Sequence, residues 1–168
     1  RMSPVTRLGL KLLALTFVRP GELRQAAWRE FDIAGRIWEV PAERMKMRVS
    51  HLVPLSPQTI EALEQLRELT GNSPLLFPGR SDATKPISDN TFRQALHSMG
   101  FNVTAHGFRA TASTLLNEMG YRADAIERQL SHGERNKVRA AYNRAEYLEE
   151  RKIMMDRWGD YLAGLSQA

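Results

Sequence analysis

The residues of this chain that could do chemistry include a histidine and an arginine, His106 and Arg109, with two residues between them. They stand near the start of the stretch 104–118, whose small and apolar residues predict a helix. Because residues i and i+3 share a helix face, one face is expected to carry a titratable imidazole beside a permanent cation, an arrangement suited to binding an anion. A helix cap with a solvated arginine is the alternative interpretation. The expected core anchors of this helix are Leu115, Leu116 and Met119.

Further charged candidates occur at a helix start and in a hairpin. Arg19 and Glu22 fall at the start of a short predicted helix, where the exposed amides favour a carboxylate. A surface charge and a dipole-matching residue are their plain interpretations. Lys46 lies in a basic segment between two predicted strands, where a long cationic side chain can swing toward an anion. For this lysine and its neighbours Arg44 and Arg48, a solvated hairpin tip is an equally good interpretation.

Tyr142 differs from the other tyrosines in its surroundings. It follows two alanines, lies just past a glycine-containing turn and has arginines on either side, which suits a side chain on a mobile segment. The other tyrosines lie at helical positions among Leu, Met and Trp, so we expect them in the core: Tyr121, Tyr147 and Tyr161. Two histidines, His51 and His97, are expected on strand and helix surfaces outside any site.

The composition limits the class of protein. The 168 residues, 42% of them hydrophobic, are enough for one compact domain with a substantial core. A formal net charge of +5 and a pI of about 9.9 favour a polyanionic partner. The lack of cysteine excludes disulfides and thiolate metal sites and is compatible with a reducing cytoplasm. The sequence has no apolar run long enough for a membrane span, and its abrupt opening predicts that further domains lie upstream.

The elements that must position these residues form a predicted α+β domain that is mainly α-helical. Three short segments rich in aromatic and β-branched residues predict a small three-stranded antiparallel sheet: 28–31, 36–40 and 50–55. Apolar periodicity and capping residues predict a first helix from Ser3-Pro4 to about Val18, followed by the short helix that starts at Arg19 and runs through Ala26 or Ala27. Further helices are predicted from Ser56-Pro57 to Gly71, from Ser88 to Gly100, and over 123–130 and 146–165. Among the apolar residues expected to face inward are Leu69 and Met99.

Taken in chain order, these pieces resemble the catalytic domain of the tyrosine recombinases, most closely that of phage and genomic-island integrases. The resemblance covers nearly the whole chain. Its motifs are Arg19-x-x-Glu22-Leu23, Lys46 in a hairpin before His51-Leu52-Val53-Pro54-Leu55, His106-x-x-Arg109, Leu130-Ser131-His132 and Tyr142. The stretches 111–118 and 141–145 are similar to that integrase subgroup in particular.

The resemblance implies roles for the nucleophile and the phosphate-binding cations. Tyr142 would attack the DNA phosphate and form a 3′-phosphotyrosine, Arg19 and Arg109 would clamp the scissile phosphate, and Lys46 would act as general acid. A phosphodiester under in-line attack gains negative charge on its non-bridging oxygens, and two planar, permanently charged guanidiniums can stabilise that charge.

The remaining implied roles are supporting ones. His106 and His132 would hold the phosphate or help to move protons, and Glu22 would steady the site. Because cations occupy the place that divalent ions and carboxylates have in two-metal nucleases, we expect no metal, no other cofactor and no ATP requirement. Basic residues that are further candidates for DNA contact are Arg44, Arg48, Arg139 and Arg144.

The function that the resemblance implies is site-specific recombination of double-stranded DNA, which integrates or excises a mobile element such as a prophage. Residues 1–168 would be the catalytic domain, acting as a homotetramer on DNA in the cytoplasm, at the nucleoid, without membrane contact. The apolar face of the terminal helix would either pack within its own chain or dock on a neighbouring subunit. Two alternatives remain: DNA relaxation like that of a type IB topoisomerase, and a non-catalytic DNA-binding module of the same fold.

Overall fold

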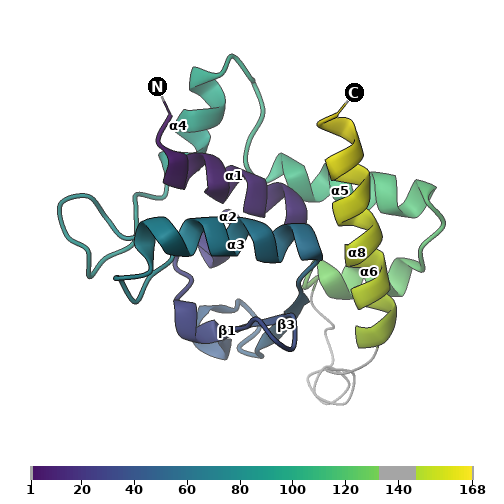
Figure 1. Cartoon of the computed structure of the whole chain (residues 1–168). Coiled ribbons are helices and arrows are strands. Elements are labelled where there is room, and N and C mark those ends of the chain that lie inside the picture. The colour runs from purple at the N-terminus through teal and green to yellow at the C-terminus, as the bar shows by residue number, and fades with distance from the viewer. Residues whose placement is uncertain (1, 133–146, 168) are drawn as a thin grey trace.

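The computed structural model describes residues 2–132 and 147–167, and its elements confirm the mainly α-helical α+β prediction (Figure 1). In chain order they are α1 (Pro4–Thr16), α2 (Pro20–Arg24), the 3-10 helix η1 (Trp28–Glu30), β1 (Phe31–Asp32), β2 (Ile37–Val40), the 3-10 helix η2 (Ala42–Arg44), β3 (His51–Pro54), α3 (Pro57–Thr70), α4 (Thr91–Ser98), α5 (Gly107–Glu118), α6 (Ala123–Gln129) and α8 (Leu148–Leu165).

Helix α1 begins and ends with local features that the rest of the fold uses. The Ser3 hydroxyl accepts a hydrogen bond from the Thr6 amide at 3.1 Å, and proline occupies the first turn. At the other end, Phe17 takes a left-handed conformation with φ of 38° and is completely buried. This turn directs the Phe17 carbonyl toward α5, where it accepts a hydrogen bond from the Arg109 side chain.

The sheet has the order β1-β2-β3 with antiparallel pairing throughout. Trp38 lies opposite Phe31 on one side and Val53 on the other, and the Trp38 and Phe31 rings stack with centroids 5.0 Å apart. The first strand is shorter than predicted because residues 28–30 form η1. The connection from β2 to β3 contains η2 and then a turn, which holds Lys46 at the surface.

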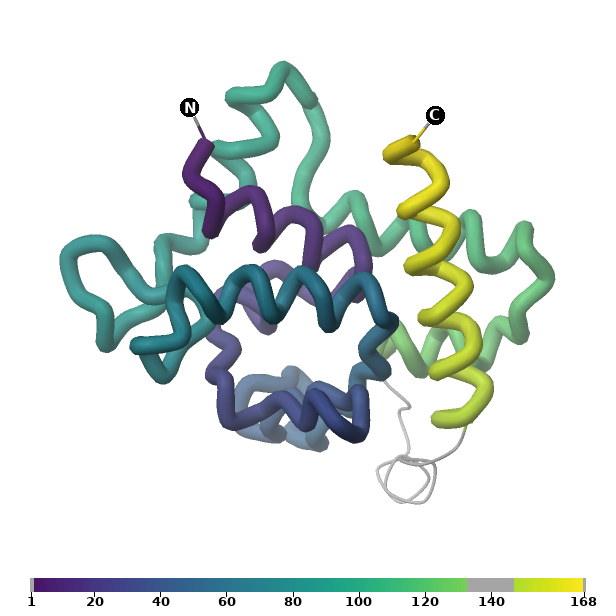
Figure 2. The backbone as a smooth tube through the Cα atoms, viewed as in Figure 1, coloured from purple at the N-terminus to yellow at the C-terminus, as the bar shows by residue number. Residues whose placement is uncertain are grey.

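Two clusters of buried side chains make up the core. The larger lies between α1, α3, the sheet and α4, while the smaller joins α5, α6 and α8 to Phe17 at the end of α1. Figure 2 shows α1 and α3 running side by side above the sheet, with α5, α6 and α8 gathered at the far end of the molecule. The end of α1 therefore connects the two clusters.

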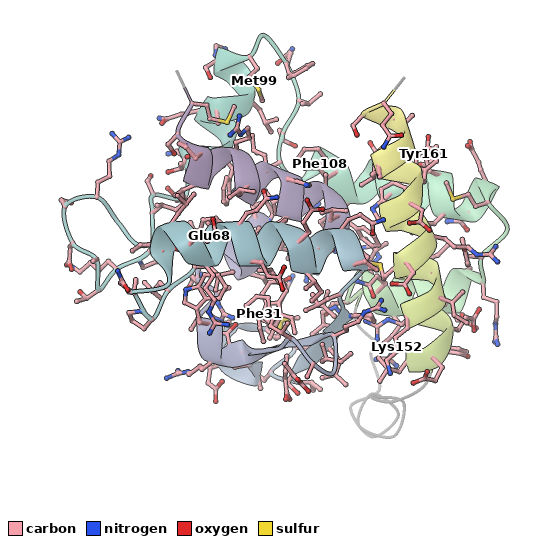
Figure 3. All side chains as sticks on the ribbon, in the orientation of Figure 1. Phe31, Glu68, Met99, Phe108, Lys152 and Tyr161 are labelled. Atoms are coloured by element: carbon pink, nitrogen blue, oxygen red, sulfur yellow. The ribbon has the colours of Figure 1, made fainter. Side chains whose placement is uncertain are left out.

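Helix α8 packs against its own chain, which confirms the first of the two interpretations of its apolar face. Met154 and Met155 are completely buried, and Trp158 is 3% exposed. The Trp158 and Phe17 rings pack edge-on with their centroids 5.9 Å apart. The Trp158 Nε1 donates a hydrogen bond to the Ala14 carbonyl at 2.9 Å. Figure 3 labels Lys152 and Tyr161 toward opposite ends of this helix, and the Tyr161 ring stacks on Trp158.

Several apolar residues predicted to face the core are exposed instead. Leu69, Met99 and Met119 lie in or just after the last turns of their helices, where the periodic pattern continues beyond the packed body, and are 52%, 43% and 41% exposed. Helix α4 starts later than the predicted Ser88, because the Ser88 hydroxyl accepts from the Asn90 amide and forms a turn before Thr91.

Within residues 2–132 and 147–167, no helix is long and apolar enough to cross a bilayer.

The packing of α8 predicts a large stability difference between two substitutions on this helix. Trp158→Ala should lower the free energy of unfolding by about 3–5 kcal/mol, because it empties part of the smaller cluster. Ile153→Ala, at a position that is 57% exposed, should change it by less than about 0.5 kcal/mol. Urea denaturation of both variants measures the difference, and equal effects would contradict the packing of α8 in its own chain.

Candidate active site

The C-terminal turn of α6 brings together three of the candidate active-site residues, Arg19, Arg109 and His132. Helix α6 ends at Gln129, and Ser131 then turns the chain in a left-handed conformation with φ of 51°. Arg109 Nη2 donates to the Leu130 carbonyl at 2.5 Å, and Arg19 Nη2 donates to the Ser131 carbonyl at 3.4 Å. Carbonyls at a helix end lack intrahelical donors, so they are natural acceptors for these guanidiniums. Two arginines distant in sequence thus bind adjacent carbonyls.

Among the predicted site residues that the structure describes, Arg109 is the most deeply buried. Its side chain rises from the first turn of α5, is 3% exposed and donates from Nη1 to the Phe17 carbonyl at 2.9 Å. Among the described residues, its Nε has no hydrogen-bond partner. Burial lowers the pKa of Arg109 below its usual value, as does the charge of Arg19, while Glu22 and Glu127 act in the opposite direction. The guanidinium spans the ends of α1 and α6.

Arg19 and Glu22 form one unit at the start of α2. The Glu22 carboxylate accepts from the Arg19 main-chain amide at 3.1 Å and pairs with its guanidinium at 2.9 Å. Glu22 is 6% exposed, whereas the Arg19 side chain is 33% exposed. The buried carboxylate therefore holds a cation whose guanidinium still reaches solvent.

His132 is oriented by a carboxylate that sequence reasoning did not identify. Its Nδ1 lies 2.7 Å from Glu127 Oε2, and its main-chain amide donates to the Glu127 carbonyl at 3.1 Å. A carboxylate acceptor at Nδ1 favours the proton there, which leaves Nε2 as the acceptor of the neutral ring. The spacing of five residues across a helix end, rather than the three or four of a helix face, explains why the pair went unnoticed.

His51 corrects a sequence-based expectation, because it is buried rather than at the strand surface. It is 7% exposed, and its Nε2 lies 3.1 Å from the Gln129 carbonyl, so Nε2 carries the proton and donates. Burial is the main cause that lowers its pKa to about 3, followed by the charges of Arg151, Arg109 and Arg19. The signal was present in the sequence, since His51 alternates with inward-facing Val53 along β3.

The other predicted residues are not drawn into this set of contacts. Lys46 and His106 are exposed, and neither side chain has a hydrogen-bond or ion-pair partner in the part of the chain that is described. The spacing of His106 and Arg109 predicts one shared helix face, but His106 is the N-cap of α5 and exposed, while Arg109 points into the protein. Three further predicted residues lie outside the described residues: Arg139, Tyr142 and Arg144.

The two hairpin arginines have different surroundings. Arg44 pairs with Glu30 and donates to the Glu22 carbonyl at 3.2 Å, so its side chain links the hairpin to α2. Arg48 is exposed and donates to the Glu43 carbonyl at 3.2 Å. Arg48 therefore has the greater freedom to reach a ligand.

Comparison with known proteins identifies the family. The sequence profile of the Phage integrase family matches residues 2–149. The chain belongs to the phage integrase family. It is 49% identical to the integrase of Enterobacteria phage P4 in an alignment of 176 positions. This alignment covers 94% of this chain and 40% of the phage P4 protein. It is 43% identical over 161 residues to the prophage integrase IntA of Escherichia coli K12, covering 95% of this chain and 39% of that protein.

Solved structures share the fold of this integrase-family chain. The integrase from mycobacterium phage Brujita matches with a TM-score of 0.74 and 20% identity, over 94% of this chain and 53% of that one. XerA recombinase matches with a TM-score of 0.62 and 18% identity, over 90% and 64%. These likenesses confirm the fold, and the family match confirms the resemblance to tyrosine recombinases. The chain spans about two fifths of the length of the curated relatives it matches.

The buried His51 predicts a pH dependence of stability in this integrase-family chain. Between pH 7 and 5 the unfolded chain binds a proton at this residue that the folded chain does not, so stability falls as the pH falls. A pKa of about 3 in the folded state makes this contribution about 2 kcal/mol at pH 5. Between pH 7 and pH 5, the free energy of unfolding of His51→Gln should therefore fall by about 2 kcal/mol less than that of the parent chain, as measured by urea denaturation at both pH values. Equal losses would show that His51 is protonated in the fold.

Proposed function

We propose that this chain is the catalytic domain of an integrase that cuts and rejoins double-stranded DNA at specific sites through a 3′-phosphotyrosine. The observation that carries the proposal is the attachment of Arg19 and Arg109 to adjacent carbonyls of one turn, directly before His132. Two guanidiniums held this way would supply permanent positive charge to one phosphate. Membership of the phage integrase family supports the same reaction.

The proposed first step is an in-line attack of the Tyr142 oxygen on the scissile phosphorus. The new bond joins phosphorus to the tyrosine oxygen, the bond to the 5′ oxygen breaks, and Lys46 gives the departing oxygen a proton. Arg19 and Arg109 stabilise the charge that grows on the non-bridging oxygens, an effect larger in the transition state than in the ground state. The buried Arg109 Nε, which lacks a partner among the described residues, is a further donor on the same side chain.

Tyr142 must lose its proton for this attack, because a phenol with a pKa near 10 is a weak nucleophile at neutral pH. Cations close to the phenol would favour the phenolate, and His132 is suited to accept the proton, since Glu127 occupies its Nδ1 and leaves Nε2 as the acceptor of the neutral ring. His106 would hold the phosphate. In the second step a 5′-hydroxyl of another strand attacks phosphorus and releases the tyrosine, so bond energy is conserved and neither ATP nor a metal is needed.

The wider setting of this reaction follows from the same proposal. The partner is double-stranded DNA at the cytoplasmic nucleoid, bound by a homotetramer of the full-length protein, and the outcome is integration or excision of a mobile element. Four basic residues would contact the DNA backbone: Arg44, Arg48, Arg139 and Arg144. The ion pair with Glu30 limits how far the Arg44 guanidinium can move toward the DNA. Phosphate contacts of this kind make binding weaken steeply as salt rises.

A matched pair of tyrosine substitutions tests the proposed nucleophile. On a nicked suicide duplex that carries the element's own attachment site, the full-length protein should form a covalent adduct stable in detergent, with and without EDTA. Tyr142→Phe should abolish the adduct, whereas Tyr161→Phe, which removes the hydroxyl of a ring stacked on Trp158, should leave it intact.

The other outcomes separate the competing functions. An adduct that persists in Tyr142→Phe would contradict the assigned nucleophile. Supercoil relaxation without joining of two sites would favour the topoisomerase alternative. A protein that binds the duplex but forms no adduct would be the non-catalytic module.

A further inference from the structure

The first turn of α8 places a buried arginine against the elements of the candidate active site. Arg151 is 1% exposed, and its Nε and Nη2 donate to Gln129 Oε1 at 3.0 and 2.9 Å. Nη2 also donates to the Leu52 carbonyl of β3. One guanidinium therefore joins α8, the end of α6 and β3.

The residue that Arg151 holds begins the run of carbonyls on which the candidate site is built. The Gln129 carbonyl accepts from His51 Nε2, and the next two carbonyls accept from Arg109 and Arg19. A displacement of Gln129 would carry these carbonyls with it, because they follow it directly along the backbone. The side chain of Arg151 is thus linked to Arg109 and Arg19 through the main chain at the end of α6.

Packing alone does not call for a charge at position 151. The inward-facing neighbours of Arg151 on α8 are Met154, Met155 and Trp158, so an apolar residue would continue the stripe. Among the described residues no carboxylate pairs with this guanidinium, whose partners are neutral oxygens. Burial, together with the charge of Arg128, lowers the pKa of Arg151 to about 9. A buried cation with only neutral acceptors is costly, so its hydrogen bonds need another purpose than stability.

We propose that Arg151 is a positioning residue for DNA cleavage, which holds the last turn of α6 so that Arg109 and Arg19 meet one phosphate together. The inference rests on the proposed function, because it takes the two arginines as the phosphate ligands. It gives Arg151 no contact with DNA. Its loss should therefore slow the cleavage step and leave DNA affinity unchanged, since small misplacements of catalytic groups are costly in rate.

The test measures single-turnover cleavage of the suicide duplex and, separately, its dissociation constant with the full-length protein. Arg151→Met should cleave about 100-fold more slowly at unchanged affinity. Arg151→Lys, which keeps a charge and a donor, should recover part of the rate. Arg157→Met removes an exposed arginine from the same helix and should cleave at the wild-type rate.

A double variant distinguishes positioning from a general loss of structure. If Arg151 acts through Arg109, then Arg109→Ala with Arg151→Met should be no slower than Arg109→Ala alone, because the two changes remove one function. If Arg151→Met does not fold, as judged by circular dichroism, Gln129→Met removes the acceptor instead and should show the same slowing.

Three results would overturn the positioning role. They are a wild-type rate in the folded variant, a rate loss matched by an equal loss of DNA affinity, and full additivity with Arg109→Ala. A wild-type protein that forms no adduct would overturn the proposed function and this inference with it. An adduct from the wild-type protein together with normal cleavage by Arg151→Met would overturn this inference alone.

Discussion

The hydrogen bonds at the end of α6 are the constraint on which the rest of the candidate site depends. A helix ends with carbonyls that have no donor of their own, and leaving them buried and unpaired is costly. Here three successive carbonyls, those of Gln129, Leu130 and Ser131, accept from His51, Arg109 and Arg19. Because the acceptors are consecutive, their donors are brought together from β3, α5 and the start of α2. The unpaired carbonyls at the end of this helix thereby bring two guanidiniums and one neutral imidazole together.

Such a cluster needs electrostatic compensation, which the carboxylates Glu22 and Glu127 provide. Both act to raise the pKa of Arg109, against burial and the charge of Arg19. Glu22 binds Arg19 directly, and Glu127 binds His132 at the far side of the same turn. His51 adds no charge at neutral pH, because its pKa is about 3. The site thus holds its guanidiniums in place before any anion arrives.

The sequence predicted the elements well and the contacts poorly, for a physical reason. Caps, prolines and alternation act over a few residues, so the helices opened by Ser3 and Ser56 and the order of the sheet followed directly. Arg19, Glu22 and Arg109 were singled out because they are spaced like the family's motifs; Arg19 and Arg109 bond to carbonyls of the α6 turn, and Glu22 pairs with Arg19. His51 and Arg151 were missed because a polar residue on an apolar stripe gains its meaning from partners far away in sequence, Gln129 above all.

The central claim is that the α6 turn presents Arg19 and Arg109 to one phosphate. A crystal structure of the Tyr142→Phe variant of the full-length protein, bound to a duplex with its attachment site, tests this most directly. The account predicts both guanidiniums within hydrogen-bond distance of the same scissile phosphate while still bonded to the Ser131 and Leu130 carbonyls. Guanidiniums on different phosphates, or released from the turn in order to bind, would contradict it.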